Sequence, residues 1–291
     1  MFKSTEEWGK GVPVENPGRF SALAVWVARY LIWPLVRVLF RPRLYGIENL
    51  PQRGPFLLVA NHSAGAGIAE ILSLVALYVR DVGPDRPLAG FALPQGFHVF
   101  PLSFLLRAIG AIPSTYAAAE ETLGKGVPIL VFPGGDHETL RPVWRANQAD
   151  FGGRKGFLKV ARNAGVPIVP LGIQGAHYTC PIFLRAGWLA WVLLVPRLIG
   201  LKRWGISLPG LLGAAAILAW VPWAIEWRAL LVWLWLGSPL VFLPIIPWRI
   251  NMRIGTPFQL EALDAKDDLD EVGQLHSVER CIEALLAAPK A

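Results

Sequence analysis

The stretch "PFLLVANHSAGAGIAE" (residues 55–70) decides the fold, because a continuously apolar run ends abruptly at Asn61 and His62. A short apolar run that is bounded by Pro and followed by Gly is typical of a buried strand in a parallel or mixed sheet. Five of the seven residues after His62 are Gly or Ala, and the first carboxylate belongs to Glu70. The stretch therefore predicts a strand whose carboxyl end holds a titratable ring in a spacious loop.

Two later stretches repeat this pattern: "PILVF" (128–132) runs into "PGGD", and "PIVPLGI" (167–173) runs into "QGAH". Helix-like segments lie at 68–80, 101–109, 116–125 and 153–164, and strand and helix patterns return at 249–260 and near 275–287. Alternating strands and helices indicate an α/β fold, whose ligands bind at the carboxyl ends of the strands. We therefore predict one α/β domain over 43–291, with a mixed, mostly parallel sheet flanked by helices.

The composition favours a protein that works at a lipid surface. Hydrophobic residues make up 54% of the chain, charged residues only 17%, and there are 13 Trp. A formal charge of +7 suits nucleic acid or anionic lipid, and the apolarity favours lipid. We expect a membrane-associated protein that binds lipid substrate and anionic membrane surfaces, with no nucleic-acid partner. The two cysteines lack paired spacing and the N-terminus does not read as a signal peptide, so we expect the active site to face the cytoplasm.

Residues 1–42 are predicted to form a polar segment followed by a helix at the membrane interface. The apolar run 21–40 carries Arg29 and Arg37, and a central Arg costs about 2.5–3.5 kcal/mol in a spanning helix. A helix in the plane of the interface, with its arginines reaching the head groups, fits better. A plain core helix is the alternative.

Residues 206–247 form a hydrophobic insert whose only charges are Glu226 and Arg228. Its two uncharged runs are each nearly long enough to span a bilayer, but only three residues separate them. We expect a hairpin that dips into one leaflet, rather than two spans or an ordinary buried core. Basic residues that flank the insert could rest on anionic head groups: Arg197, Lys202 and Arg203.

His62 is the first candidate for chemistry. A neutral imidazole at the end of a strand can remove a proton from a bound alcohol, whereas a structural His in a turn is the alternative. The turn "VFPGGDHE" (131–138) adds Asp136, His137 and Glu138 at a neighbouring strand end. The N–H groups of Gly134 and Gly135 could bind an oxyanion there, although Pro-Gly-Gly is also an ordinary turn.

Together these motifs resemble the glycerolipid acyltransferase superfamily. Its first motif is similar to Asn61–His62, its third to Phe-Pro-Gly-Gly (132–135), and its fourth to "GVPIVP" (165–170); "GAIPST" (110–115) stands at the place of the second. The ordered set covers about 43–175, and "RIGTPFQL" (253–260) also matches. The resemblance implies that His62 acts as general base on an acceptor hydroxyl, which attacks an acyl thioester. Acyl-CoA or acyl carrier protein would be the co-substrate, with no bound cofactor or metal.

The departures from this family are informative. The Asp that usually follows the motif His by five positions is Gly67 here. Gly134, Asp136 and His137 replace the usual Glu, Thr and Arg of the third motif, and "GAIPST" supplies no Arg. These arginines hold the acceptor's phosphate in the family, so a phosphorylated acceptor is less expected. Pro-Gly-Gly-x-x-Glu is similar to the diacylglycerol acyltransferase branch, whose Glu is matched by Glu138.

The carboxylate beside His62 is left open between several groups. We favour Glu138, which comes from a neighbouring strand end. Glu70 lies two helical turns from His62 if that segment is helical, so we expect it to point elsewhere. Asp136 or a backbone carbonyl would also serve. We further expect substrate contacts from the residues around both motifs and from the basic start of the helix at 153–164: Asn61, Ser63, Phe132, Pro133, Gly134, Gly135, Arg141, Arg154 and Lys155.

Two rival interpretations remain. "NHSAG" also resembles the nucleophile elbow of α/β-hydrolases, with Ser63 as nucleophile, Asp136 as acid and His177 as base of a lipid esterase. Asn fits the crowded first position of such an elbow poorly. Alternatively, a degenerate acyltransferase site only binds lipid, as loss of the family's Asp and arginines would allow.

Overall fold

The computed structural model describes residues 5–63, 65, 67–198, 200–260 and 270–288. Its centre is a seven-stranded sheet with the order β1-β9-β6-β2-β5-β3-β4. All neighbouring strands are parallel except β6 and β9. The strands are Arg43–Tyr45 (β1), Leu57–Ala60 (β2), Ala89–Ala92 (β3), Ile112–Pro113 (β4), Ile129–Val131 (β5), Ile168–Gln174 (β6) and Asn251–Ile254 (β9). The predicted mixed, mostly parallel sheet with flanking helices is confirmed.

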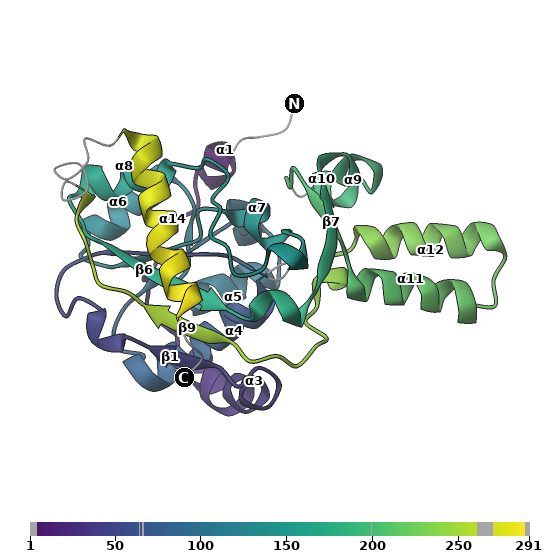
Figure 1. Cartoon of the computed structure of the whole chain (residues 1–291), viewed down its shortest axis with the longest axis horizontal. Helices are drawn as coiled ribbons and strands as arrows, with labels where there is room; N and C mark the ends of the chain where they lie inside the picture. Colours follow the sequence, from purple (N-terminus) through teal and green to yellow (C-terminus); the bar gives the residue numbers. More distant parts are fainter. Residues whose placement is uncertain (1–4, 64, 66, 199, 261–269, 289–291) are drawn as a thin grey trace.

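Helices cover both faces of this sheet (Figure 1). The body contains α1 (Thr5–Gly9), α4 (Ile68–Leu77), α5 (Leu102–Ala108), α6 (Tyr116–Gly124), α7 (Gly135–Thr139), α8 (Gly156–Ala164) and α14 (Glu271–Ala287). A π-helical turn, Tyr78–Val82, extends α4. The helices predicted from 68, 101, 116, 153 and 275 are therefore all present, with boundaries shifted by a few residues.

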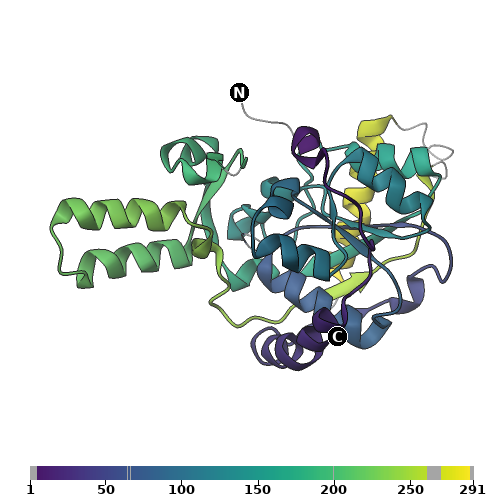
Figure 2. The same cartoon turned by 180° about the vertical axis from the view of Figure 1, so that it is seen from behind.

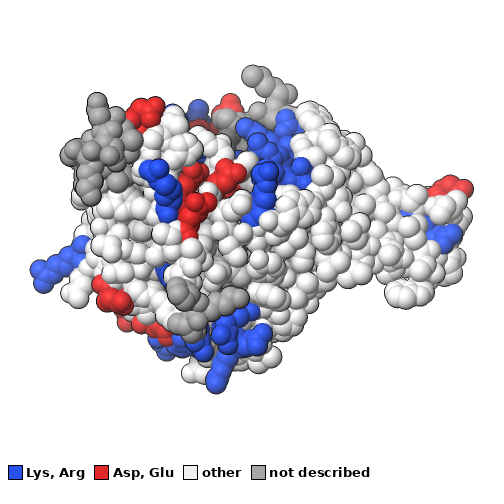
Figure 3. Space-filling view, in the orientation of Figure 1, with Lys and Arg blue, Asp and Glu red and all other residues white. Residues whose placement is uncertain are grey.

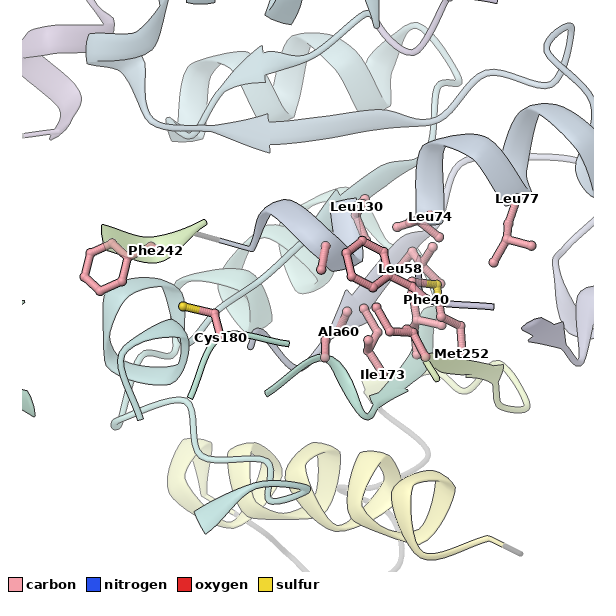
Figure 4. Packing of buried hydrophobic residues seen from close by; sticks show 14 of the residues in the cluster. Phe40, Leu58, Ala60, Leu74, Leu77, Leu130, Ile173, Cys180, Phe242 and Met252 are labelled. Atoms are coloured by element: carbon pink, nitrogen blue, oxygen red, sulfur yellow. The ribbon is translucent and has the colours of Figure 1, made fainter. Parts of the chain in front are cut away.

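The strands build two hydrophobic cores because successive side chains point to opposite faces. On β2, Leu58 and Ala60 join one core, beneath α4, while Leu57 and Val59 join the other, beneath α6, α8 and α14. Figure 4 shows the first core, where Leu58 and Leu130 pack with Leu74 of α4. Burial on both faces explains why these strands are continuously apolar. It also fixes the strand ends that carry the polar residues.

One apolar helical segment in the described chain is long enough to cross a membrane, Ala22–Leu39. It consists of α2 (Ala22–Val27), a π-helical turn (Ala28–Ile32) and α3 (Trp33–Leu39). Val36 and Phe40 are buried in the core beneath α4, whereas Trp26 and Tyr30 are exposed. The helix predicted at 21–40 is present and half-packed on the body. Its place at a membrane interface, and the division of the chain at residue 42, stay predictions.

The predicted insert projects from the body as an arm (Figures 1 and 2). We define the arm as residues 182–242. It begins with strand β7 (Ile182–Ala186), helices α9 (Gly187–Val192) and α10 (Val195–Leu198), and strand β8 (Trp204–Ser207), which pairs antiparallel with β7. A helical hairpin follows, α11 (Leu208–Trp220) and α12 (Ile225–Gly237), and a turn of 3-10 helix (Pro239–Phe242) returns to the body. Since Pro209, Gly210 and Gly237 are the buried residues of these two helices and the others are exposed or half-buried, the hairpin is no ordinary buried core.

Candidate active site

Asn61 fixes the end of β2. Its side-chain amide donates to the carbonyl of Ile173 at 2.9 Å, and the N–H of Ile173 donates to its Oδ1 at 2.7 Å. The side chain thereby continues the hydrogen bonding between β2 and β6 beyond the last paired residue. Asn61 is completely buried, so it holds the loop that starts at His62 and does not face the substrate space as we predicted.

The ring of His62 is hydrogen-bonded through Nδ1 to Oε1 of Glu70. Glu70 is completely buried and also accepts from Ser63, from the N–H at 3.0 Å and from Oγ at 2.5 Å. It lies in the first turn of α4, where the helix dipole stabilises a negative charge. No described residue is hydrogen-bonded to Nε2, and the His62 side chain is 13% exposed. One ring nitrogen is thus held and the other is left for a ligand.

This contact corrects our expectation that Glu70 points away from His62. That expectation assumed a helix running through both residues, but α4 begins only at Ile68. The first turn of this helix lies against the ring, because Glu70 is bonded to Nδ1. A separation of eight residues is therefore short in space.

Gly67 explains why the family's usual Asp is absent. Its φ of +70° is a left-handed conformation that favours glycine. A Cβ at this position would lie 2.3 Å from Cε1 of His62 and 3.2 Å from Oε1 of Glu70. The space that a side chain would need is thus taken by the ring and the carboxylate of Glu70. The absence of a side chain at Gly67 therefore leaves room for the contact between Glu70 and the ring.

Glu138 holds the backbone of His62 instead of its ring. One carboxylate oxygen accepts the N–H of His62 at 2.9 Å, and the other accepts Nη2 of Arg141 at 3.0 Å and the N–H of Asp150 at 3.1 Å. Burial raises the pKa of the Glu138 carboxyl to about 7, against the lowering effects of Arg141 and of the two backbone donors. Glu138, which we favoured as the partner of the imidazole, therefore contacts the backbone of His62 and not its ring.

Phe132 and the turn that follows it form one wall of the site. The Phe132 ring stacks on the His62 ring, with 4.3 Å between centroids and 25° between planes. The N–H of Gly135 donates to the carbonyl of Phe132 at 3.2 Å. Of the two predicted oxyanion donors, Gly135 is therefore already used within the turn. The N–H of Gly134 has no hydrogen-bond partner among the described residues.

The charged residues around this turn are mostly bonded to one another. Arg154 donates to the carbonyls of Pro133 and Gly134 and pairs with Asp136, which also lies 3.8 Å from Nη1 of Arg203. Asp136 is thus held by arginines and not by His62. Arg141 is buried between Glu138 and the carbonyl of Gln148, and Lys155 pairs with Glu271 of α14 at 3.4 Å. Arg141 and Lys155 thus both have partners within the chain, and a contact of either residue with substrate stays a prediction.

The hydrolase triad is not assembled. The hydroxyl of Ser63 is buried and donates to Glu70, while Asp136 is held by arginines. His177 is buried, and burial together with the charge of Arg141 lowers its pKa to about 3. A nucleophile, base and acid in one hydrogen-bonded chain are required for that mechanism. Ser63 and Asp136 have other partners, and no described residue is hydrogen-bonded to Nε2 of His177.

An apolar cavity of about 130 Å³ lies behind Phe132. Its walls come from α4, β3, β5, the end of α5 and the residues after it, and its lining includes Ile71, Val75, Gly90, Leu106 and Leu130. The sequence did not suggest it, since the strand pattern of β3 was missed. Among the residues that the structure describes, no group of three or more His, Cys, Asp or Glu side chains could hold a metal ion.

The residues of this site lie in a part of the chain that matches a known protein family. Residues 41–174, from the segment before β1 to the end of β6, match the family described as Acyltransferase. These residues therefore form an acyltransferase-family domain. The fold agrees: the crystal structure of the 1-acyl-sn-glycerophosphate (LPA) acyltransferase PlsC from Thermotoga maritima resembles it with a TM-score of 0.50 at 18% identity, covering 91% of this chain and 81% of that one.

Curated relatives are similar over about half to two thirds of the chain. An uncharacterized protein of Mycobacterium tuberculosis is 29% identical over 203 residues, which are 68% of this chain and 54% of the relative. A Bos taurus protein named "DGAT1/2-independent enzyme synthesizing storage lipids" is 28% identical over 156 residues, 54% of this chain and 43% of the relative. The chain thus spans about half the length of the curated relatives it matches.

Proposed function

We propose that this chain is a membrane-associated O-acyltransferase that moves a fatty acyl group from an acyl thioester to the hydroxyl of a lipid alcohol. The observation that carries the proposal is the His62 ring, held at Nδ1 by the buried Glu70 and open at Nε2. A carboxylate on Nδ1 fixes the proton there, so Nε2 keeps the lone pair that a general base needs. The active site would face the cytoplasm.

In this mechanism Nε2 accepts the proton of the acceptor hydroxyl as its oxygen attacks the thioester carbonyl. The carbonyl oxygen gains negative charge, for which the unpaired N–H of Gly134 is the available donor. The carbon–sulfur bond then breaks, and the thiolate takes the proton back from the imidazolium. Glu70 stabilises the imidazolium that forms between these steps. No bond to the enzyme is made.

The cavity behind Phe132 suits the acyl chain. Its lining is apolar, and Phe132 separates it from the His62 ring. An acyl chain that enters there would place its thioester at the Phe132 turn, next to Nε2. Burial of each CH₂ group is worth about 0.8 kcal/mol, so a chain of modest length would hold the donor firmly.

A neutral acceptor fits the site better than a phosphorylated one. The motif arginines of the family are absent, Arg154 is held by the turn and Asp136, and Arg141 is buried with Glu138. The name of the Bos taurus relative, an enzyme synthesizing storage lipids, points in the same direction. We therefore propose a glycerolipid with a free hydroxyl, such as a diacylglycerol, as the acceptor class.

The test is release of free thiol from acyl-CoA, and from acyl carrier protein, with detergent-dispersed neutral and phosphorylated acceptors. His62→Ala should lower kcat at least about 100-fold, since general base catalysis contributes about 10²–10⁴. Ser63→Ala is the matched control and should lose less than about tenfold, because it removes one hydrogen bond to Glu70. Ester hydrolysis that depends on Ser63 would favour the esterase, and no turnover with any acceptor would favour a lipid-binding protein.

A further inference from the structure

The hairpin of α11 and α12 has side chains that no part of the described body covers. The helices contact each other, for example through Trp235, whose indole N–H donates to the carbonyl of Gly210 at 3.0 Å. Their other faces are exposed, with Trp220 81% accessible. The large apolar residues that are exposed on the hairpin and its tip are Leu211, Leu212, Leu218, Trp220, Trp223, Ile225, Trp227, Leu230 and Leu234.

The apolar surface runs round the whole hairpin. Between residues 206 and 247 the only charges are Glu226 and Arg228 at the tip, and Figure 3 shows a hairpin that is otherwise uncharged on the visible face. A helix that rests on a membrane surface has one polar face, whereas a helix that is apolar all round belongs in an apolar medium. Since the body does not supply that medium, the hairpin requires a partner that surrounds it.

Basic residues lie at the base of the hairpin, next to the turn that contains Asp136 and His137. Arg203 directly precedes β8 and shares the single carboxylate of Asp136 with Arg154. Arg185 on β7 donates to the carbonyl of His137, and burial and the neighbouring charge of Arg203 lower its pKa. Figure 3 shows basic side chains gathered where the arm meets the body. Trp188 in α9, which directly follows β7 in the chain, is exposed, and Trp favours the membrane–water interface.

We propose that the α11–α12 hairpin is immersed in one leaflet of a lipid bilayer, with Arg185, Lys202 and Arg203 at anionic head groups. Each helix has 13 residues and is about 20 Å long, too short for a hydrocarbon layer of about 30 Å. Perpendicular insertion would bring Glu226 near the bilayer midplane, where a charge is strongly unfavourable. The hairpin therefore lies at a slant that keeps both charged ends near the head groups.

The arm also connects the bilayer to the site. Trp204 is buried at its base, donates to the carbonyl of Leu236 at 2.7 Å and packs edge-on against Phe242. Phe242 packs so closely on Gly65, in the loop after His62, that a Cβ there would lie 2.7 Å from the Phe242 Cβ. Strand β7, at the start of the arm, contacts the turn that contains Glu138, because Arg185 donates to the carbonyl of His137. Docking of the hairpin thus sets the position of His62 relative to the membrane.

The first test is flotation of the full chain with vesicles of phosphatidylcholine, with and without phosphatidylglycerol. Leu212→Asp combined with Leu230→Asp places charges on exposed faces and should lower vesicle partitioning at least about tenfold. Val272→Asp, at an exposed apolar residue of α14, is the matched control and should leave it unchanged. Lys202→Glu should weaken binding about fivefold, and only when phosphatidylglycerol is present.

A second measurement does not depend on the overall affinity. An environment-sensitive dye on Leu234→Cys should shift to shorter wavelength when vesicles are added, whereas the same dye on Val272→Cys should not. Equal responses at both positions would overturn the proposal. The proposal would also be overturned if the parent chain were a dimer, the Leu212→Asp, Leu230→Asp double variant were a monomer, and vesicle binding stayed intact. The hairpin's partner would then be a second copy of the chain. Thiol release from acyl-CoA in detergent should be unchanged in the Asp pair, which separates this proposal from the proposed reaction.

Discussion

Two completely buried glutamates contact His62, and they hold different parts of it. Glu70 follows His62 in the chain and binds the ring, whereas Glu138 comes from the neighbouring strand end and binds the backbone N–H. The first arrangement can set a tautomer and stabilise an imidazolium; the second can only fix where the loop starts. Proximity of a carboxylate to a candidate base therefore does not show its role, and the atom that it contacts does.

The strongest test of this difference compares the kcat of the Glu70→Gln variant with that of the Glu138→Gln variant. The amide of Gln at position 70 would donate to Nδ1 and move the ring proton to Nε2, which removes the lone pair that the base uses. We expect kcat to fall on the order of 10³-fold with little change in KM. Glu138→Gln should lower kcat less than about tenfold. Steady-state kinetics of both variants check this, and equal losses would show that the two carboxylates act as one unit.

The sequence alone predicted the mixed, mostly parallel sheet and most of its helices. It also singled out His62 as a candidate base, but it did not assign the carboxylate that contacts the ring. Continuous apolar runs such as 57–60 carry their own signal, because burial on both faces demands it. The position of Glu70 depends on where helix α4 begins, at Ile68, and the sequence before it has no periodicity that would locate this start. Strand β3 at 89–92 contains Gly and Ala and lacks a strong apolar pattern. The pairing of Lys155 with Glu271 joins residues far apart in the chain, which no local pattern reveals.

Gly67 offers a second, smaller test. Gly67→Ala forces a Cβ onto the His62 ring and a side chain into a left-handed conformation. We expect a stability loss of about 1–2 kcal/mol from the backbone alone, and a fall in kcat between tenfold and 100-fold as the ring is displaced. Thermal unfolding and kinetics measure the two effects separately.

The control for this position is Gly153→Ala, because Gly153 has a similar φ of +72° and open space around its Cβ. It should show the stability loss without the fall in kcat. Gly67→Asp in a Glu70→Ala background should not restore activity, since the carboxylate would enter the volume of the ring. Restored activity would mean that the loop can adopt the arrangement usual in the family.

The last prediction concerns the pH dependence of stability and the carboxyl of Glu138. In the folded chain this carboxyl keeps its proton up to a pH of about 7, whereas the unfolded chain releases it near the ordinary pKa of 4.5. Between these values the folded state binds more protons, so the contribution of Glu138 to stability is full below pH 4.5 and is lost as the pH rises through 7. A shift of this size corresponds to roughly 3 kcal/mol.

Glu138→Gln removes this titration. Its amide also faces the N–H of His62 or the donors of Arg141 and Asp150, so the variant should be less stable than the parent at every pH. The difference in the free energy of unfolding should shrink between pH 5 and pH 8, because only the parent loses the contribution. Urea unfolding across this range measures it. A difference that stays constant would mean that Glu138 is ionised throughout and that its three hydrogen-bond donors outweigh its burial.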